Sequence, residues 1–128
     1  MYEILPEGLY LGSVMATKNK ELMEQMGITH ILSMGEPCIK VPQNGTVKYF
    51  DIRDDDDADM LSILPEVVEF ISQAIEGNGK IIVHCFAGTS RSASCVIAYI
   101  MATRRLDYEK AYAVVHKQCR SIVPNFVF

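Results

Sequence analysis

The chain has 128 residues, of which 49% are hydrophobic and 22% charged, and its formal net charge is −4 at pH 7. These values are typical of one globular domain spanning residues 1–128, and the acidic balance argues against nucleic acid or an anionic membrane as the main partner. No apolar run approaches the ~18 residues of a membrane-spanning helix, and the first residues lack the basic and apolar regions of a signal peptide. We therefore expect no membrane insertion and a cytoplasmic location, with the nucleus as a second compartment.

The cysteines argue against a structural metal or a disulfide framework. They are widely spaced and include no CxxC pair: Cys38, Cys85, Cys95 and Cys119. Zinc sites and disulfide-rich domains use closer spacings, so we expect free thiols, no metal and no cofactor. The sequence does not define the oligomeric state, and a monomer is assumed.

The first half of the chain predicts short strands around one helix. Alternating or β-branched apolar residues indicate strands at 5–13, as one strand or a pair, at 28–33 and at 47–52. Between the first two, Leu22, Met23 and Met26 recur at helical spacing. Thr17 is the expected cap of this helix, and Gly27 is its expected end.

The second half alternates helices with one more strand. An acidic run precedes a helix over 60–75, whose apolar face holds Leu61, Leu64, Val67, Val68, Ile71, Ala74 and Ile75. A strand follows at 80–83, then a helix to about Arg105 and a last helix from Asp107 that Pro124 breaks. This order predicts an α/β fold with a central, mostly parallel twisted sheet flanked by helices, and ligands at the carboxyl ends of the strands.

The stretch His84-Cys85-Phe86-Ala87-Gly88-Thr89-Ser90-Arg91-Ser92 joins the predicted strand end to a helix start. Unpaired backbone N–H groups at a helix N-terminus attract anions and lower the pKa of a nearby thiol, so Cys85 is a candidate nucleophile. The Arg91 guanidinium can hold two phosphoryl oxygens at once, and Gly88 permits a tight turn around an anion. Ser92 can hydrogen-bond the Cys85 sulfur and assist its release from a phosphorylated intermediate.

This stretch matches the pattern HCxxGxxRS and resembles the protein tyrosine phosphatase superfamily. The segments 8–13, 27–32, 98–101 and 124–125 resemble landmarks of its dual-specificity branch. The resemblance implies a protein tyrosine phosphatase-like fold and hydrolysis of phosphotyrosine, phosphoserine and phosphothreonine in protein substrates through a phosphocysteine. It implies that residues 86–91 bind phosphate: Phe86, Ala87, Gly88, Thr89, Ser90 and Arg91.

The resemblance also implies two supporting residues and a general acid. His84 supports the loop, and Ser33 occupies a position where relatives often have an asparagine that braces it. An aspartic acid protonates the leaving group: a count of 31 residues back from Cys85 gives Asp54, which we favour, while a count forward from Ile52 gives Asp56. Asp55 lies between them, and a solvated acidic loop or a weak divalent-cation site is the alternative for the rest of the run.

Two other functions are compatible with this sequence. One is a phosphate-binding adaptor that does not turn its ligand over. The other is a phosphatase for a phosphoinositide, RNA 5′-phosphate or phosphoglycan, although no Lys or Arg lies between Cys85 and Arg91 to serve a polyphosphorylated group.

Overall fold

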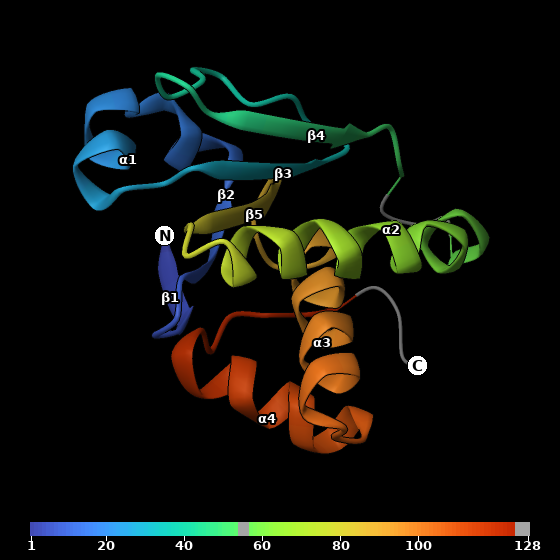
Figure 1. Ribbon diagram of the computed structural model, residues 1–128. Helices are drawn as coiled ribbons and strands as arrows, with labels where there is room; N and C mark the ends of the chain where they lie inside the picture. The colour runs from blue at the N-terminus through green and yellow to red at the C-terminus, as the bar shows by residue number, and fades with distance from the viewer. Residues whose placement is uncertain (54–56, 125–128) are drawn as a thin grey trace.

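The computed structural model describes residues 1–53 and 57–124. Five strands form one sheet in the order β1-β2-β5-β3-β4 (Figure 1). Their bounds are β1 Tyr2–Leu5, β2 Leu9–Ser13, β3 His30–Met34, β4 Thr46–Phe50 and β5 Ile81–Cys85. β1 pairs antiparallel with β2, and the other three neighbouring pairs are parallel. The predicted α/β fold with a mostly parallel sheet is therefore confirmed, and the first predicted strand segment forms a pair that begins at Tyr2.

The helices lie on both sides of this sheet. They are the short 3-10 helix η1 Val14–Lys18, then α1 Lys20–Met26, α2 Asp57–Glu76, α3 Arg91–Arg104 and α4 Tyr108–Gln118. Figure 1 shows α1 on one side, with α2, α3 and α4 on the other. None of the helices within the described ranges is both long enough and apolar enough to cross a membrane.

The central strands are apolar on both faces because both faces are covered by helices. One row of paired residues packs with Met23 of α1, and it contains Tyr10, Ile82 and Ile31. The next row belongs to the larger core formed with α2, α3 and α4, and it contains Leu11, Val83 and Leu32. Burial of each such side chain contributes about 1.5–3 kcal/mol, so the centre of the sheet is a rigid base for the loops at its edge.

The prediction that Thr17 caps the first helix is wrong. Thr17 lies in η1 and is fully buried. Its hydroxyl donates to the backbone carbonyl of Val14 (2.7 Å) and accepts the backbone N–H of Ile39 (2.9 Å). Asn19 caps α1 instead, by accepting a backbone N–H of the first turn (3.0 Å). Gly27 ends the helix in the left-handed conformation (φ 80°), as predicted.

The predicted apolar face of α2 is only partly buried. Val67, Ile71 and Ala74 are fully buried, but Leu61 is 57% exposed. Leu61 borders a groove between α2 and α3 in place of the core. The last helix, α4, ends at Gln118, so Pro124 does not terminate it.

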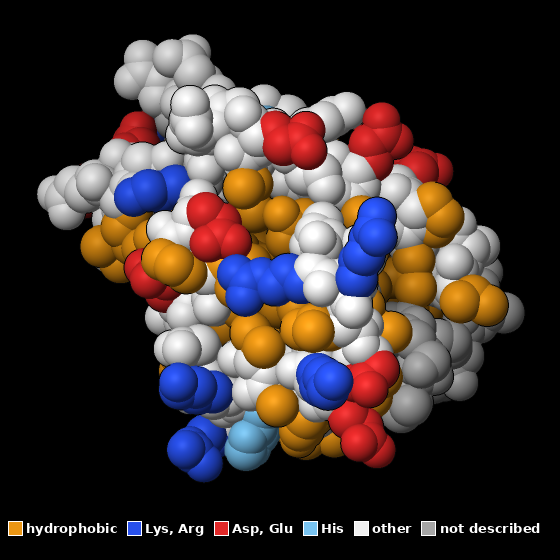
Figure 2. Space-filling model, turned by 60° about the horizontal axis from the view of Figure 1, so that its bottom comes forward, with side chains coloured by type: hydrophobic (Ala, Val, Ile, Leu, Met, Phe, Trp, Pro, Cys, Tyr) orange, Lys and Arg blue, Asp and Glu red, His pale blue; other side chains and the backbone are white. Residues whose placement is uncertain are grey.

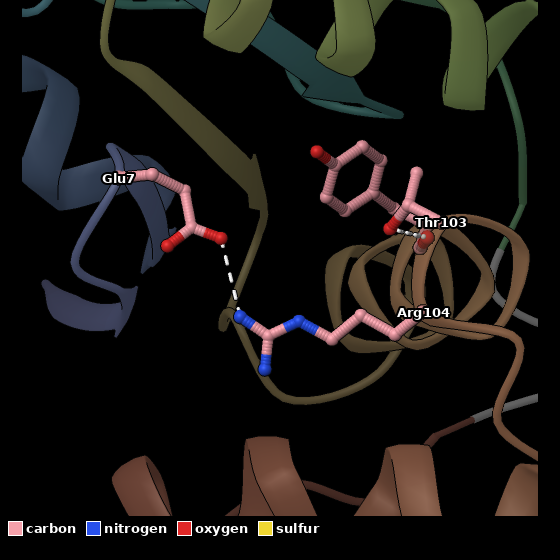
Figure 3. Close-up of polar contacts among 4 residues, drawn as sticks. Glu7, Thr103 and Arg104 are labelled. Carbon is pink, nitrogen blue, oxygen red and sulfur yellow. Dashed lines mark hydrogen bonds and ion pairs between the residues drawn. The ribbon is translucent and has the colours of Figure 1, made fainter.

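An ion pair connects the end of α3 to the turn between β1 and β2. Arg104 Nη2 lies 3.2 Å from Glu7 Oε1, and Figure 3 shows the two side chains pointing toward one another. In the same turn of α3, the Thr103 hydroxyl donates to the Tyr99 carbonyl (2.8 Å). Both ion-pair side chains are more than 40% exposed, so the pair contributes at most about 1 kcal/mol.

Candidate active site

The loop 86–90 connects the carboxyl end of the central strand β5 to the first residue of α3. Cys85 is the last residue of β5, and Arg91 is the first of α3. β2 lies on one side of β5, where Ser13 is paired with Cys85, and β3 lies on the other side. The loop therefore sits at the edge of the sheet where parallel α/β folds bind their ligands.

The Cys85 thiol is buried and receives several hydrogen bonds. Its Sγ lies 3.1 Å from Ser92 Oγ and accepts the Gly88 N–H at 3.2 Å. Burial by itself raises the pKa of this thiol, but the Ser92 hydroxyl and the backbone N–H groups of Ser92, Gly88 and Ser90 lower the pKa, with a net decrease. The surroundings of Cys85 therefore favour the thiolate, which is the nucleophilic form of cysteine.

The Arg91 guanidinium is held at the carboxyl ends of β3 and β4. Its Nη1 donates to the Ile52 carbonyl at 3.0 Å. Ile52 precedes Asp54 by two residues, so the contact ties Arg91 to the segment that leads into the acidic run. Arg91 is half-buried, and a guanidinium can donate two parallel hydrogen bonds to an oxyanion.

Gly35 is a site residue that the sequence analysis missed. It has φ 80°, and a Cβ at this position would overlap Arg91 Nη1 and lie 2.6 Å from the Ile52 carbonyl oxygen. The absence of a side chain at Gly35 therefore makes room for the guanidinium. A glycine two residues after the predicted strand at 28–33 was the available signal.

The loop is fixed by its backbone. Gly88 has φ 77°, and a Cβ there would lie 2.6 Å from the Gly12 carbonyl carbon and oxygen. The Val14 N–H donates to the Phe86 carbonyl (3.1 Å), and the Val123 N–H donates to the Thr89 carbonyl (2.6 Å). The side chains of the predicted phosphate-binding residues Phe86 and Ala87 are exposed, and those of Thr89 and Ser90 are half-buried.

His84 and Ser33 form a buried pair beneath the loop. Both are fully buried, and His84 Nε2 lies 2.7 Å from Ser33 Oγ. Within the described residues His84 Nδ1 has no hydrogen-bond partner. Burial lowers the pKa of His84 to about 4, while the backbone of Cys85 has a smaller, opposite effect. The ring is therefore neutral near pH 7, and Ser33 fixes its orientation.

The three candidate general acids, Asp54, Asp55 and Asp56, lie outside the described residues. Of the other thiols, Cys95 and Cys119 are buried and Cys38 is half-buried, and none of them forms a disulfide. An apolar groove of about 580 Å³ lies between α2 and α3, and no residue of the loop lines it.

Comparisons with known proteins agree on one family. The sequence model of the dual specificity phosphatase catalytic domain matches residues 9–128. The chain is 35% identical over 127 residues to dual specificity protein phosphatase PHS1 of Arabidopsis thaliana, covering 95% of this chain and 14% of that protein. It is 32% identical over 122 residues to dual specificity protein phosphatase 1B of the same plant, covering 94% and 73%.

A solved structure gives the same answer. The human tyrosine phosphatase-like serine/threonine/tyrosine-interacting protein superimposes with a TM-score of 0.86 at 35% identity, covering 97% of this chain and 87% of that one. The chain therefore belongs to the dual specificity phosphatase family.

Proposed function

We propose that the protein is a phosphatase that hydrolyses phosphotyrosine, phosphoserine and phosphothreonine in proteins through a phosphocysteine intermediate. The observation that carries this proposal is the thiol of Cys85, buried at the end of β5 yet hydrogen-bonded by Ser92 and by Gly88 N–H. These contacts stabilise a sulfur anion at the base of a loop that leads into a helix N-terminus. Membership of the dual specificity phosphatase family supports the same reaction.

In the first step the Cys85 thiolate attacks phosphorus in line with the ester oxygen. An S–P bond forms as the P–O ester bond breaks, and the leaving oxygen takes a proton from a carboxylic acid, assigned to Asp54. The loop N–H groups and the Arg91 guanidinium stabilise charge on the three equatorial oxygens. Because Gly35 and Ile52 fix the position of the guanidinium, little reorganisation is needed in the transition state.

In the second step water attacks the phosphocysteine. The carboxylate of the same aspartate accepts a proton from this water, an O–P bond forms, and the S–P bond breaks to release phosphate and thiolate. The Ser92 hydroxyl, 3.1 Å from Sγ, donates a hydrogen bond to the departing thiolate. No metal or cofactor takes part in either step.

Phosphorylated proteins are the proposed partners, and the compartment is the cytoplasm, with the nucleus as a second location. A reducing compartment protects a thiolate of lowered pKa from oxidation. A monomer is sufficient for the proposed chemistry, because the nucleophile, the guanidinium and the candidate acids all belong to one chain.

A phosphate-binding adaptor is the second candidate function, because one solved relative is named a phosphatase-like interacting protein. Cys85 and Ser92 favour hydrolysis, since a binding site needs neither a nucleophile nor a hydroxyl to assist its release. A phosphoinositide, RNA or phosphoglycan substrate is less favoured, because no Lys or Arg lies between Cys85 and Arg91.

The test is turnover of p-nitrophenyl phosphate and of tyrosine- and threonine-phosphorylated peptides in the presence of EDTA. We expect Cys85→Ser to abolish turnover and Arg91→Lys, which keeps the charge but loses the planar fork, to lower kcat/KM by about 10²–10³-fold. Wild-type protein that binds phosphopeptide without releasing phosphate would establish the adaptor instead.

The general acid is identified by three single variants, Asp54→Asn, Asp55→Asn and Asp56→Asn. Loss of a general acid lowers the rate by about 10²–10⁴-fold. We expect this loss in Asp54→Asn, with the basic limb of the pH–rate profile absent, and near wild-type rates in the other two. Equal rates in all three variants would contradict the assignment.

A further inference from the structure

Three lysines surround one pocket next to the candidate active site. The pocket has a volume of about 430 Å³ and is formed by η1, the start of α1 and the loop that follows β3. Its lining residues are Lys18, Lys20, Lys40, Met15, Asn19 and Glu21. The lysines outnumber the one carboxylate, so the pocket carries a local positive charge on a protein whose net charge is −4.

Hydrogen bonds hold this pocket in a fixed position relative to the loop that follows Cys85. Val14 N–H at the start of η1 donates to the Phe86 carbonyl of that loop (3.1 Å). The buried Thr17 hydroxyl accepts the Ile39 N–H (2.9 Å), and the Thr17 carbonyl accepts the Lys40 N–H (3.1 Å). Hydrogen bonds through η1 therefore connect the lysine-bearing segments to the phosphate-binding loop.

Exposed apolar side chains occur on the loop and on η1. Phe86 is 62% exposed and Met15, which also lines the pocket, is 59% exposed. They belong to the two segments that the hydrogen bond between Val14 and Phe86 joins. Large exposed apolar side chains at the edge of a binding site commonly contact a ligand, so these two form a surface along which a peptide can lie.

The distance between Cys85 and the lysine pocket corresponds to a few residues of extended peptide. Ser13 is paired with Cys85, and neighbouring strands are about 4.8 Å apart. A 3-10 helix rises about 2 Å per residue, which places the Lys18 backbone roughly 10–15 Å from Cys85. An extended peptide advances about 3.3 Å per residue, so the pocket corresponds to a position about three to five residues from the phosphorylated one.

Charge on the face around α4 is distributed differently. Figure 2 shows the face around α4, where Lys and Arg side chains alternate with Asp and Glu across a partly hydrophobic surface. Such a mixture has little preference for either sign of charge. The lysine pocket gathers three of the 12 Lys and Arg residues of the chain around one hollow.

We propose that the pocket lined by Lys18, Lys20 and Lys40 binds an oxyanion of the phosphoprotein substrate about three to five residues from the phosphorylated residue. This proposal rests on the proposed phosphatase function and adds a preference among its substrates. The oxyanion is a glutamate carboxylate or a second phosphate, since both accept hydrogen bonds from ammonium groups. The pocket selects acidic segments without taking part in the chemical steps.

The experiment compares kcat/KM for a series of phosphotyrosine peptides. The peptides are identical except at one position, which lies three to five residues before or after the phosphotyrosine. One set carries glutamate there, one phosphoserine, and one neutral glutamine. The protein variants are the triple Lys18→Gln, Lys20→Gln, Lys40→Gln and a control of equal charge change elsewhere: Arg105→Gln, Lys110→Gln, Lys117→Gln. Turnover of p-nitrophenyl phosphate, which cannot reach the pocket, reports on folding and on basal chemistry.

We expect wild-type protein to prefer the acidic peptides by about tenfold, with the preference decreasing at high salt. The pocket variant should lose the preference and keep p-nitrophenyl phosphate turnover, whereas the control should keep both. A larger effect of phosphoserine than of glutamate identifies phosphate as the source of the oxyanion, and the reverse identifies a carboxylate. Equal rates on acidic and neutral peptides, or a preference that survives in the pocket variant, would overturn the proposal. If the wild type does not turn over p-nitrophenyl phosphate, the phosphatase function itself is overturned.

Discussion

Protonation of His84 should destabilise the folded protein as the pH falls below neutrality. The ring is fully buried, one of its nitrogens contacts Ser33 and the other has no partner within the described residues. A protonated imidazole carries a positive charge, and the folded state would have to bury that charge away from water. Burial accordingly lowers the pKa of His84 from 6.5 to about 4.

The sign and size of the effect follow from proton linkage. Because the pKa is lower in the folded state, the unfolded state takes up the proton first as the pH decreases. The contribution of neutral His84 is therefore complete above pH 6.5 and is lost progressively down to about pH 4. At about 1.4 kcal/mol per pH unit, this interval corresponds to about 3 kcal/mol, a large part of the ~5–15 kcal/mol that stabilises a typical domain.

Urea unfolding at several pH values between 7 and 4 measures this effect. Other groups titrate in the same range, so the relevant quantity is the difference in unfolding free energy between wild type and His84→Gln. Glutamine keeps a polar group near Ser33 but does not titrate. From pH 7 to pH 4 we expect the wild type to lose about 3 kcal/mol of unfolding free energy relative to His84→Gln. A difference that does not depend on pH would refute the reasoning.

Two other predictions concern the geometry of the site. Gly35→Ala should lower kcat/KM by about 10²-fold or more by displacing the Arg91 guanidinium, whereas Gly27→Ala, at the same φ of 80° but with its nearest neighbour 3.9 Å away, should cost stability without this loss of activity. Comparable activity in the two purified variants would show that Gly35 does not position the arginine. Ser92→Ala should raise the pKa of Cys85, because the hydroxyl lowers that pKa in the native site, and the rate of iodoacetamide alkylation against pH should shift to higher pH. An unshifted profile would mean that the backbone N–H groups alone set the acidity.

Much of the fold was predictable because it depends on patterns local in sequence. Alternation of apolar residues located the strands, and Gly27 marked the end of α1. The loop from Cys85 to Arg91 could be read from nine consecutive residues, since its backbone connects a strand directly to a helix. The boundaries were less accurate, because the pairing of neighbouring strands determines them.

The errors arose where a contact joins distant parts of the chain. Thr17 has the side chain of a helix cap, but a hydrogen bond to Ile39, 22 residues away, takes it into the interior. Gly35 depends on Arg91, 56 positions later in the sequence, and no local pattern encodes that overlap. The contact of Ser33 with His84 spans 51 residues, so its position beside the loop could be predicted only from the family resemblance.

The loop 86–90 is attached to its neighbours through main-chain atoms, at the Phe86 carbonyl on one side and the Thr89 carbonyl on the other. Any amino acid except proline can supply the N–H groups that such a cradle requires. The exposed side chains at 86 and 87 can therefore vary, and with them the surface that the loop presents, while the backbone of the loop keeps its shape.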